Sequence, residues 1–524
     1  MLAWGFILYL ALILLSVPRR QHRYAPLAAF AAFAAMYLGD AVGGAPNETL
    51  GLVLYVVAGA LACLISPARY RVLTVAAFAM WTPAIRLFGP DPLAGGYPAW
   101  VAAATVAALF FLVGVLVARD APDEDERLRR IGLGLVAVAC VARISERHFV
   151  VASPGALAPD DVWALVVIAV LPILAVAKIR RPTRDALTTG VALGAYVLVA
   201  VALLLGKGYH VDTVAVEHRA TEIFLSGHDP YRELDIPEAL RRFGLDPGLA
   251  THLEDGSALR SFNYPALSFL VPAPFVAAGL RDIRFLYLAE IVAFVLVLVG
   301  QVRVPWRPLV TAAVVGNAVI ARQNVLAGVD PLWAVFTTCA FLFLGRRLLS
   351  PALLGLACAA RQPAWFFVPF YLLVIWKREG LSAALRRLGI TAIAFALPNL
   401  PFFIASPADF LAGVFDPMLA SLEPYGVGLI RFSMDGALPL LPRGVFGALS
   451  VAAMAGLLWL LWRFWRHIPN GALVFASVSL WFAWRSLQNY FSFAGILAMA
   501  GDERIITGDV DPATETGSPT VMTT

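Results

Sequence analysis

The chain has 524 residues, of which 60% are hydrophobic and only 14% are charged, and its formal net charge is +5. Soluble proteins average about 25% charged residues, so this composition excludes a soluble globular protein and indicates a chain that lies mostly in lipid. The basic residues cluster in short loops, which is typical of membrane topology and excludes a nucleic-acid-binding stripe. Four cysteines without CxxC spacing are predicted to be small core residues: Cys63, Cys140, Cys339 and Cys358.

The first 206 residues contain eight apolar segments that are candidates to span a bilayer. Basic clusters alternate with neutral or acidic turns between them, and the positive-inside rule makes the basic side cytoplasmic. This places the N-terminus and the polar residues 207–263, here called the polar loop, outside the cell. Residues 1–186 are predicted to be an accessory membrane domain of about seven spans. The eight segments are Leu2–Val17, Ala25–Val42, Leu50–Ile65, Val72–Phe88, Ala99–Ala118, Ile131–Arg147, Trp163–Lys178 and Leu187–Gly206.

Asp212 lies in the polar loop only six residues after the span Leu187–Gly206. A carboxylate at a membrane surface can act as a general base or hold a divalent cation. Asp is also a favoured helix N-cap, so a capping role for Asp212 stays open. If a helix begins there, Arg219 lies two turns further along the same face.

Four further residues of the polar loop could supply metal ligands: His210, Glu217, His218 and Glu222. Their order matches no known closed metal site, and a solvated amphipathic helix is the simpler interpretation. No metal ligand is therefore assigned, although a divalent cation such as Mg²⁺ or Mn²⁺ stays open as a cofactor.

The segment Tyr264–Leu280 is interrupted by three prolines, which break helices because proline lacks an N–H group and clashes with the preceding turn. The segment could span the membrane, or it could be a re-entrant or surface helix pair that packs on protein. The positions of the basic loops downstream favour the second interpretation. This interpretation requires Leu353–Ile375 to form a hairpin that turns near Arg361.

Three arginines are predicted to lie at or near the membrane edge: Arg322, Arg361 and Arg485. A charge at membrane depth costs several kcal/mol and is a functional-site hypothesis by default. Arginine binds phosphate oxygens in a bidentate manner, so these residues could bind a lipid phosphate. The alternative is that each arginine pairs with a buried acid, for example Arg322 with Asp330.

The order of several short motifs resembles the GT-C glycosyltransferases, in particular the polyprenol-phosphate-sugar-dependent, mannosyltransferase-like branch. The resemblance covers residues 187–501, and it departs from the family pattern where Arg361 replaces a lysine and Ala266 replaces a second proline. Its motifs are Asp212 after a span, Ala220 through Asp229-Pro230-Tyr231, Tyr264-Pro265-Ala266-Leu267, Gly355 through Arg361-Gln362-Pro363, and Arg485 through Phe491.

This resemblance implies an all-α, polytopic membrane helical bundle whose long extracytoplasmic loop carries short surface helices. It implies an inverting transfer of a sugar, with mannose suggested by the branch, from a polyprenyl or dolichyl phosphate to an acceptor hydroxyl. Asp212 would be the general base. Candidate substrate-binding residues are Arg219, Asp229, Tyr231, Tyr264, Arg322, Arg361, Gln362 and Arg485.

The expected location is the plasma membrane, with a multi-pass topology and the active site facing outward. The acceptor could be a lipid, a glycan or a protein, and no nucleic-acid partner is expected. A transporter or flippase of lipid-linked sugars is the alternative function, since charged residues in spans suit transport as well. Residues 502–524, rich in Asp, Thr, Gly and Pro, are predicted to be a disordered tail.

Overall fold

A computed structural model describes residues 181–206, 208–302, 307, 311, 314, 328–426, 428–434, 439–465, 471–490 and 493. The first seven predicted spans, the predicted tail 502–524 and Arg322 lie outside these residues. Most of the described chain is helical, which confirms the all-α prediction. In the described part, extended pairing is confined to short contacts such as that of β1 (Tyr425–Gly426) with β2 (Arg485–Ser486), which run parallel.

Four described helices are long and apolar enough to cross a membrane: α8 (Arg181–Gly206), α14 (Arg284–Gln301), α20 (Leu381–Ala405) and α23 (Arg443–Phe464). Helices of 18 to 26 residues reach about 27 to 39 Å at 1.5 Å per residue, which matches a hydrocarbon layer of about 30 Å. Large apolar side chains on them are exposed, such as Leu198 at 73% and Trp459 at 61%. An apolar outer face of this kind suits lipid rather than water.

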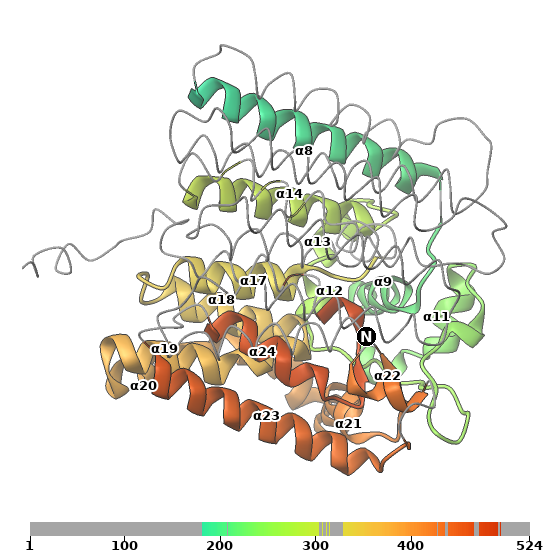
Figure 1. Cartoon of the computed structure of the whole chain (residues 1–524). Coiled ribbons are helices and arrows are strands. Elements are labelled where there is room, and N and C mark those ends of the chain that lie inside the picture. The colour runs from blue at the N-terminus through green and yellow to red at the C-terminus, as the bar shows by residue number, and fades with distance from the viewer. Residues whose placement is uncertain are drawn as a thin grey trace, which may run out of the picture.

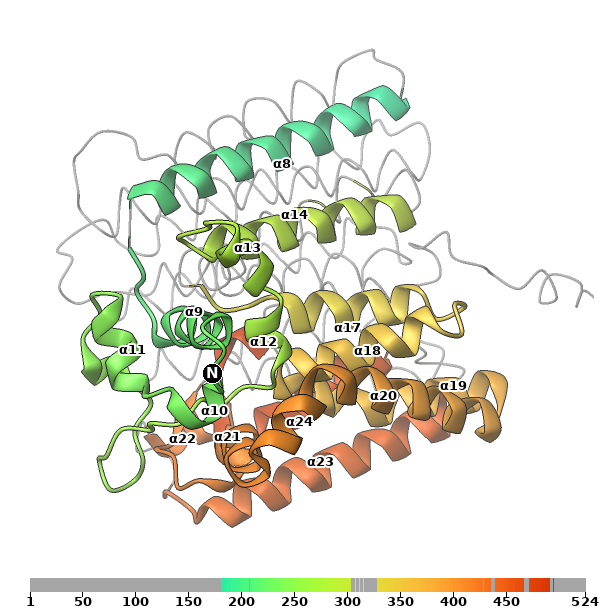
Figure 2. The same cartoon turned by 180° about the vertical axis from the view of Figure 1, so that it is seen from behind.

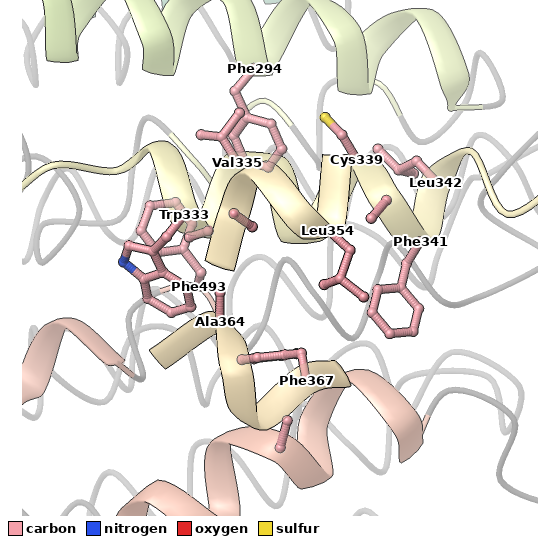
Figure 3. Close-up of a cluster of buried hydrophobic side chains, with 14 of the residues drawn as sticks. Phe294, Trp333, Val335, Cys339, Phe341, Leu342, Leu354, Ala364, Phe367 and Phe493 are labelled. Carbon is pink, nitrogen blue, oxygen red and sulfur yellow. The ribbon is translucent and has the colours of Figure 1, made fainter. Parts of the chain in front are cut away.

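Shorter helices pack between the long ones and run roughly alongside them (Figure 1). Their common core joins Phe294 of α14, Trp333 of α17, Phe367 of η7 and Phe493 (Figure 3). Cys339 and Cys358 are buried free thiols in this core, as predicted for them. The shorter elements are α17 (Leu332–Leu342), α18 (Leu349–Ala360), η7 (Gln362–Phe367), α19 (Val368–Glu379) and α24 (Gly471–Trp481).

The helices of the polar loop collect at one end of the long helices, together with the segments around α21 and α22 (Figures 1 and 2). The predicted short helices of this loop are therefore confirmed. The elements of this end are α9 (Asp212–Leu225), α10 (Pro230–Glu233), α11 (Ile236–Arg242), η4 (Pro247–Leu249), α12 (Leu267–Leu270), α13 (Ala273–Ala277), α21 (Pro407–Leu419), α22 (Leu429–Met434) and η8 (Gln488–Tyr490).

The proline-rich segment after the polar loop forms two short helices, α12 and α13, separated at Pro272. From Leu267 to Ala277 they would extend about 16 Å at most, which is too short to cross the hydrocarbon layer. The segment is thus a broken helix pair packed on protein, in agreement with the non-crossing interpretation. The helical structure is also interrupted where the hairpin Leu353–Ile375 was predicted to turn, because α18 ends at Ala360 and Arg361 is extended.

A second core fastens the polar loop onto the bundle. Tyr231 of α10 packs against Phe410 of α21 with ring centroids 4.9 Å apart, and against Phe262 at 5.3 Å. Phe269 of α12 meets Phe402 of α20 at 5.1 Å. Aromatic pairs in these edge-on arrangements add to the stability that burial provides. These aromatic contacts therefore hold the polar loop against the end of the bundle.

Candidate active site

Asp212 is the first residue of α9, and the geometry does not make it the N-cap. That position belongs to Val211, whose side chain makes no capping bond. Oδ1 of Asp212 accepts hydrogen bonds from the amide and the hydroxyl of Thr213, at 2.7 and 3.3 Å. Oδ2 receives no donor from the described residues, and the side chain is only half-buried. One carboxylate oxygen is thus held in place while the other is available to a substrate.

The electrostatic surroundings of Asp212 act in opposite directions. Burial raises the pKa of Asp212 above its usual value, whereas the Thr213 bonds and the positive charges of Arg485 and Arg361 lower it. The net shift is upward. A carboxylate with a raised pKa is a stronger base, and the two nearby guanidinium groups favour its ionised form.

Arg361 lies at the centre of a buried charge cluster, defined here as Arg361, Glu217, Asp330 and Tyr287. Its side chain is 6% exposed and forms an ion pair with Glu217, and its Nε lies 3.8 Å from Oδ2 of Asp330. The hydroxyl of Tyr287 donates a hydrogen bond to Glu217. Arg361 therefore pairs with buried acids, which was the alternative to phosphate binding for the three predicted membrane-edge arginines. Asp330 lies next to Arg361, whereas the sequence suggested Arg322 as its partner.

Glu217 is fully buried, so the interpretation of a solvated helix is wrong for this residue and for His218. Burial raises the pKa of Glu217 to about 8, against the opposing effect of the charge on Arg361. The spacing of apolar residues around Glu217 indicates this burial. Glu217 falls in line with Val214, Ala220 and Phe224 at helical spacing, so it sits within an apolar stripe.

Two carboxylates of the cluster region have an oxygen without a hydrogen-bond donor in the described chain. Oδ1 of Asp330 accepts from the amide of Leu332 at 2.7 Å, but its Oδ2 has no such partner. Oε2 of Glu290, on α14, is also unsatisfied, and Glu290 interacts electrostatically with Asp330 and Glu217. Buried polar atoms in native proteins usually have hydrogen-bond partners, so these two unsatisfied oxygens lower the stability of the folded state.

Tyr264 connects Asp212 to the charge cluster. Its ring lies under the guanidinium of Arg361, 4.1 Å from the centroid, and its hydroxyl is 3.4 Å from that of Thr213. Its backbone carbonyl accepts a hydrogen bond from the hydroxyl of Tyr231 at 2.8 Å. The predicted residues Asp212, Tyr231, Tyr264 and Arg361 therefore meet in one site.

Gln362 and Arg485 complete the surroundings of the site. Nε2 of Gln362 donates to the carbonyls of Asn263 and Val414, at 2.9 and 3.0 Å, and so ties α21 to the end of the polar loop. Nη1 of Arg485 donates to the carbonyl of Glu423 at 3.0 Å, and its side chain is half-buried.

Two predicted substrate-binding residues make structural contacts away from Arg361. Arg219 contacts Glu222 at 3.1 Å and Glu238 at 4.0 Å in a partly exposed ion-pair group. Asp229 caps α10 by accepting from the amide of Tyr231 at 3.0 Å, and it also accepts from the hydroxyl of Ser406.

The residues considered as metal ligands point to separate environments. His218 contacts the hydroxyl of Tyr209 at 2.9 Å, whereas Glu222 binds Arg242 at 2.6 Å. In the described ranges, no group of three or more His, Cys, Asp or Glu residues is arranged to hold a metal ion.

Comparison of the chain with protein-family models, with curated proteins and with solved structures finds no match.

Proposed function

We propose that this protein is a GT-C-type membrane glycosyltransferase that uses a polyprenyl-phosphate sugar as donor. The observation that carries the proposal is Asp212, which has one fixed and one available carboxylate oxygen beside two arginines. A base next to cations is what sugar transfer from a lipid phosphate requires, because one group must take a proton while another stabilises the departing phosphate. Mannose is the sugar suggested by the motif resemblance.

In the proposed reaction, Oδ2 of Asp212 takes the proton of an acceptor hydroxyl. The hydroxyl oxygen then bonds to the anomeric carbon of the donor sugar, while the bond from that carbon to the phosphate oxygen breaks. The electron pair leaves with the polyprenyl phosphate, and the configuration at the sugar carbon is inverted. Negative charge grows on the phosphate, so a nearby guanidinium lowers the barrier.

Arg485 is the better candidate for the phosphate-binding residue. Arg361 is almost completely buried and already engaged by Glu217, so in this state it has little capacity for a substrate. Arg485 is half-buried, and the described structure gives it one hydrogen bond, from Nη1 to Glu423. We therefore assign phosphate binding to Arg485 and assign to Arg361 the positioning of Tyr264 next to Thr213.

The position of the site at the end of the bundle supports a lipid-linked donor. Asp212 follows the membrane-length helix α8 within six residues, at the end where the polar loop covers the bundle (Figure 2). A lipid donor held in the bilayer would present its phosphosugar at this level, and confinement of both reactants to the interface raises their effective concentration. The positive-inside pattern favours the extracytoplasmic side.

A transporter or flippase of lipid-linked sugars is the second candidate, and the buried acids Glu290 and Asp330 favour it. Ionisable groups in the interior of a membrane protein are typical of transport and proton pathways. Both acids have an oxygen without a donor in the described chain. This candidate predicts movement of the lipid across the bilayer without transfer of its sugar.

The decisive experiment compares the wild type with Asp212→Asn in reconstituted vesicles that contain a labelled polyprenyl-phosphate sugar. We expect transfer to a mixture of acceptors to fall by about 10²- to 10⁴-fold in the variant. Asp246→Asn is the matched control, because Asp246 is an exposed aspartate that caps η4. Transfer that is unchanged in Asp212→Asn refutes the role of this residue. A wild type that moves labelled lipid without transferring sugar establishes the flippase.

A further inference from the structure

A second site at the same end of the molecule is an open cavity of about 830 Å³. This volume lies in the range of about 300 to 1,000 Å³ that is usual for small-molecule sites. Two carboxylates, an indole ring, a guanidinium and two exposed leucines contribute to its lining: Glu254, Glu423, Trp484, Arg443, Leu440 and Leu441. None of these side chains belongs to the site around Asp212.

The wall of this cavity is built by four chain segments, around Glu254, Glu423, Leu441 and Trp484, which are joined by hydrogen bonds to backbone carbonyls. The amide of Glu254 donates to the carbonyl of Ser421 at 2.7 Å, and the amide of Glu423 donates to that of His252 at 3.0 Å. The indole N–H of Trp484 donates to the carbonyl of Leu422 at 2.5 Å. The cavity is therefore formed before a ligand arrives, which lowers the entropy cost of binding.

The side chains of the cavity present one aromatic surface and several free acceptor atoms. The edge-on contact of Trp484 with Phe446, at a centroid distance of 5.3 Å, fixes the orientation of the indole. The carboxylates of Glu254 and Glu423 are exposed, and no described residue donates a hydrogen bond to them. Arg443 directs its guanidinium to the carbonyls of Ala420 and Met418.

We infer that this cavity binds a neutral sugar unit of a glycan acceptor. An indole ring packs against the apolar C–H face of a pyranose, and ionised carboxylates accept hydrogen bonds from neighbouring hydroxyls. The exposed leucines extend the apolar surface beside the indole. The open shape of the cavity suits one unit of a longer chain. Among the lipid, glycan and protein acceptors that the sequence leaves open, this chemistry selects the glycan.

The cavity adjoins the candidate active site through neighbouring residues. Arg485 follows Trp484 directly in the chain and donates to the backbone carbonyl of Glu423, which lines the cavity. The charge of Arg485 also acts on Asp212. A glycan seated against Trp484 would thus lie beside the proposed phosphate-binding arginine. The acceptor role rests on the proposed function, whereas sugar binding by the cavity does not.

The test measures binding of mannotetraose and maltotetraose to the full chain in lipid nanodiscs by isothermal titration calorimetry. We expect saturable binding of at least one neutral oligosaccharide, weakened about tenfold or more by Glu423→Gln and by Trp484→Ala. Matched controls are Glu233→Gln, on the exposed surface, and Trp459→Ala, on the outer face of α23. These controls should bind as the wild type does.

Three outcomes separate this inference from the proposed function. Saturable oligosaccharide binding by a wild type that transfers no sugar supports the cavity and rejects the enzyme. Sugar transfer that is unaffected by Glu423→Gln and Trp484→Ala, with melting temperatures unchanged, rejects the cavity as the acceptor site. Saturable binding of spermidine in place of either oligosaccharide also overturns the inference, because it shows that the carboxylates select a cation.

Discussion

Arg361 and Glu217 form a buried ion pair across 144 positions of the chain. The pair joins the extended residue after α18 to the middle of α9, so it connects the helical bundle to the polar loop. Both side chains are almost inaccessible, at 6% and 0% exposure. A buried pair of this kind is weak evidence for net stability, but loss of one partner leaves an uncompensated charge.

The first prediction concerns the energetics of this pair. Above about pH 8, where Glu217 is ionised, Glu217→Leu leaves Arg361 without its main charged partner and should lower the free energy of unfolding by about 3 to 5 kcal/mol. The double variant with Arg361→Met should be less destabilised than the sum of the two single variants, because it removes both charges. Thermal unfolding in detergent measures both effects.

The matched control for the pair is Arg232 with Asp409, an exposed ion pair at 3.2 Å. Its removal should change the free energy of unfolding by at most about 1 kcal/mol. Additive losses in the Glu217 and Arg361 variants would show that the two side chains are not energetically coupled.

The second prediction concerns pH. The folded protein holds the pKa of Glu217 at about 8, above its usual value of 4.5, so the folded state binds a proton more tightly than the unfolded state. The contribution of this group to stability is therefore complete below about pH 4.5 and is lost as the pH rises toward 8. The upward shifts of Asp212 and Asp330 act in the same direction.

Glu217→Gln should accordingly flatten the fall in melting temperature between pH 5 and pH 8. Glu233→Gln, at an exposed position, should keep the slope of the wild type. A wild-type melting temperature that rises over this range would contradict the assignment of a raised pKa to Glu217.

The third prediction concerns the close contact between α18 and α20. A Cβ atom at Gly355 would overlap the carbonyl oxygen of Thr391 and the methyl group of Ala394. Gly355→Ala should therefore destabilise the protein by about 1 to 3 kcal/mol. The control is Gly447→Ala in α23, where a Cβ meets nothing within 4 Å and alanine should add about 0.5 to 1 kcal/mol. Equal melting temperatures for the two variants would argue against this helix contact.

The fourth prediction tests the two roles assigned to Arg485. Its charge lowers the pKa of Asp212, so Arg485→Gln should raise that pKa and move the acidic limb of the pH–rate profile upward. The maximal transfer rate should also fall, since the variant loses its contact with the leaving phosphate. Arg232→Gln, which removes an exposed arginine, should change neither quantity. A lower maximal transfer rate with an unchanged pH–rate profile would support phosphate binding by Arg485 and contradict its effect on the pKa of Asp212.

Local sequence signals predicted the features that depend on one segment at a time. The apolar run before Gly206 predicted a helix of membrane-spanning length, which α8 is, and the prolines after Tyr264 predicted the break between α12 and α13. The preference of aspartate for helix N-termini left a helix start near Asp212 open, and α9 does begin there. Such features follow from composition and backbone chemistry alone.

The partners of individual charged side chains, which depend on tertiary contacts, were not predicted. Arg219 shares a helix face with Asp212, yet it pairs with Glu222, since no rule of helical spacing chooses between partners on the same surface. The partner of Arg361 lies on α9, far away in the chain, and the buried setting of Glu217 comes from tertiary packing. The cavity beside Trp484 was missed for the same reason, because separate segments form its wall.

The separation of Glu217 from Arg361 has a consequence for biosynthesis. At translation rates of about 5 to 20 residues per second, Glu217 is synthesised roughly 7 to 30 seconds before Arg361. During this interval α9 carries an acid that belongs in an apolar setting, and protonation is one way to neutralise it. A nascent chain that stops short of Arg361 keeps this acid without its guanidinium partner.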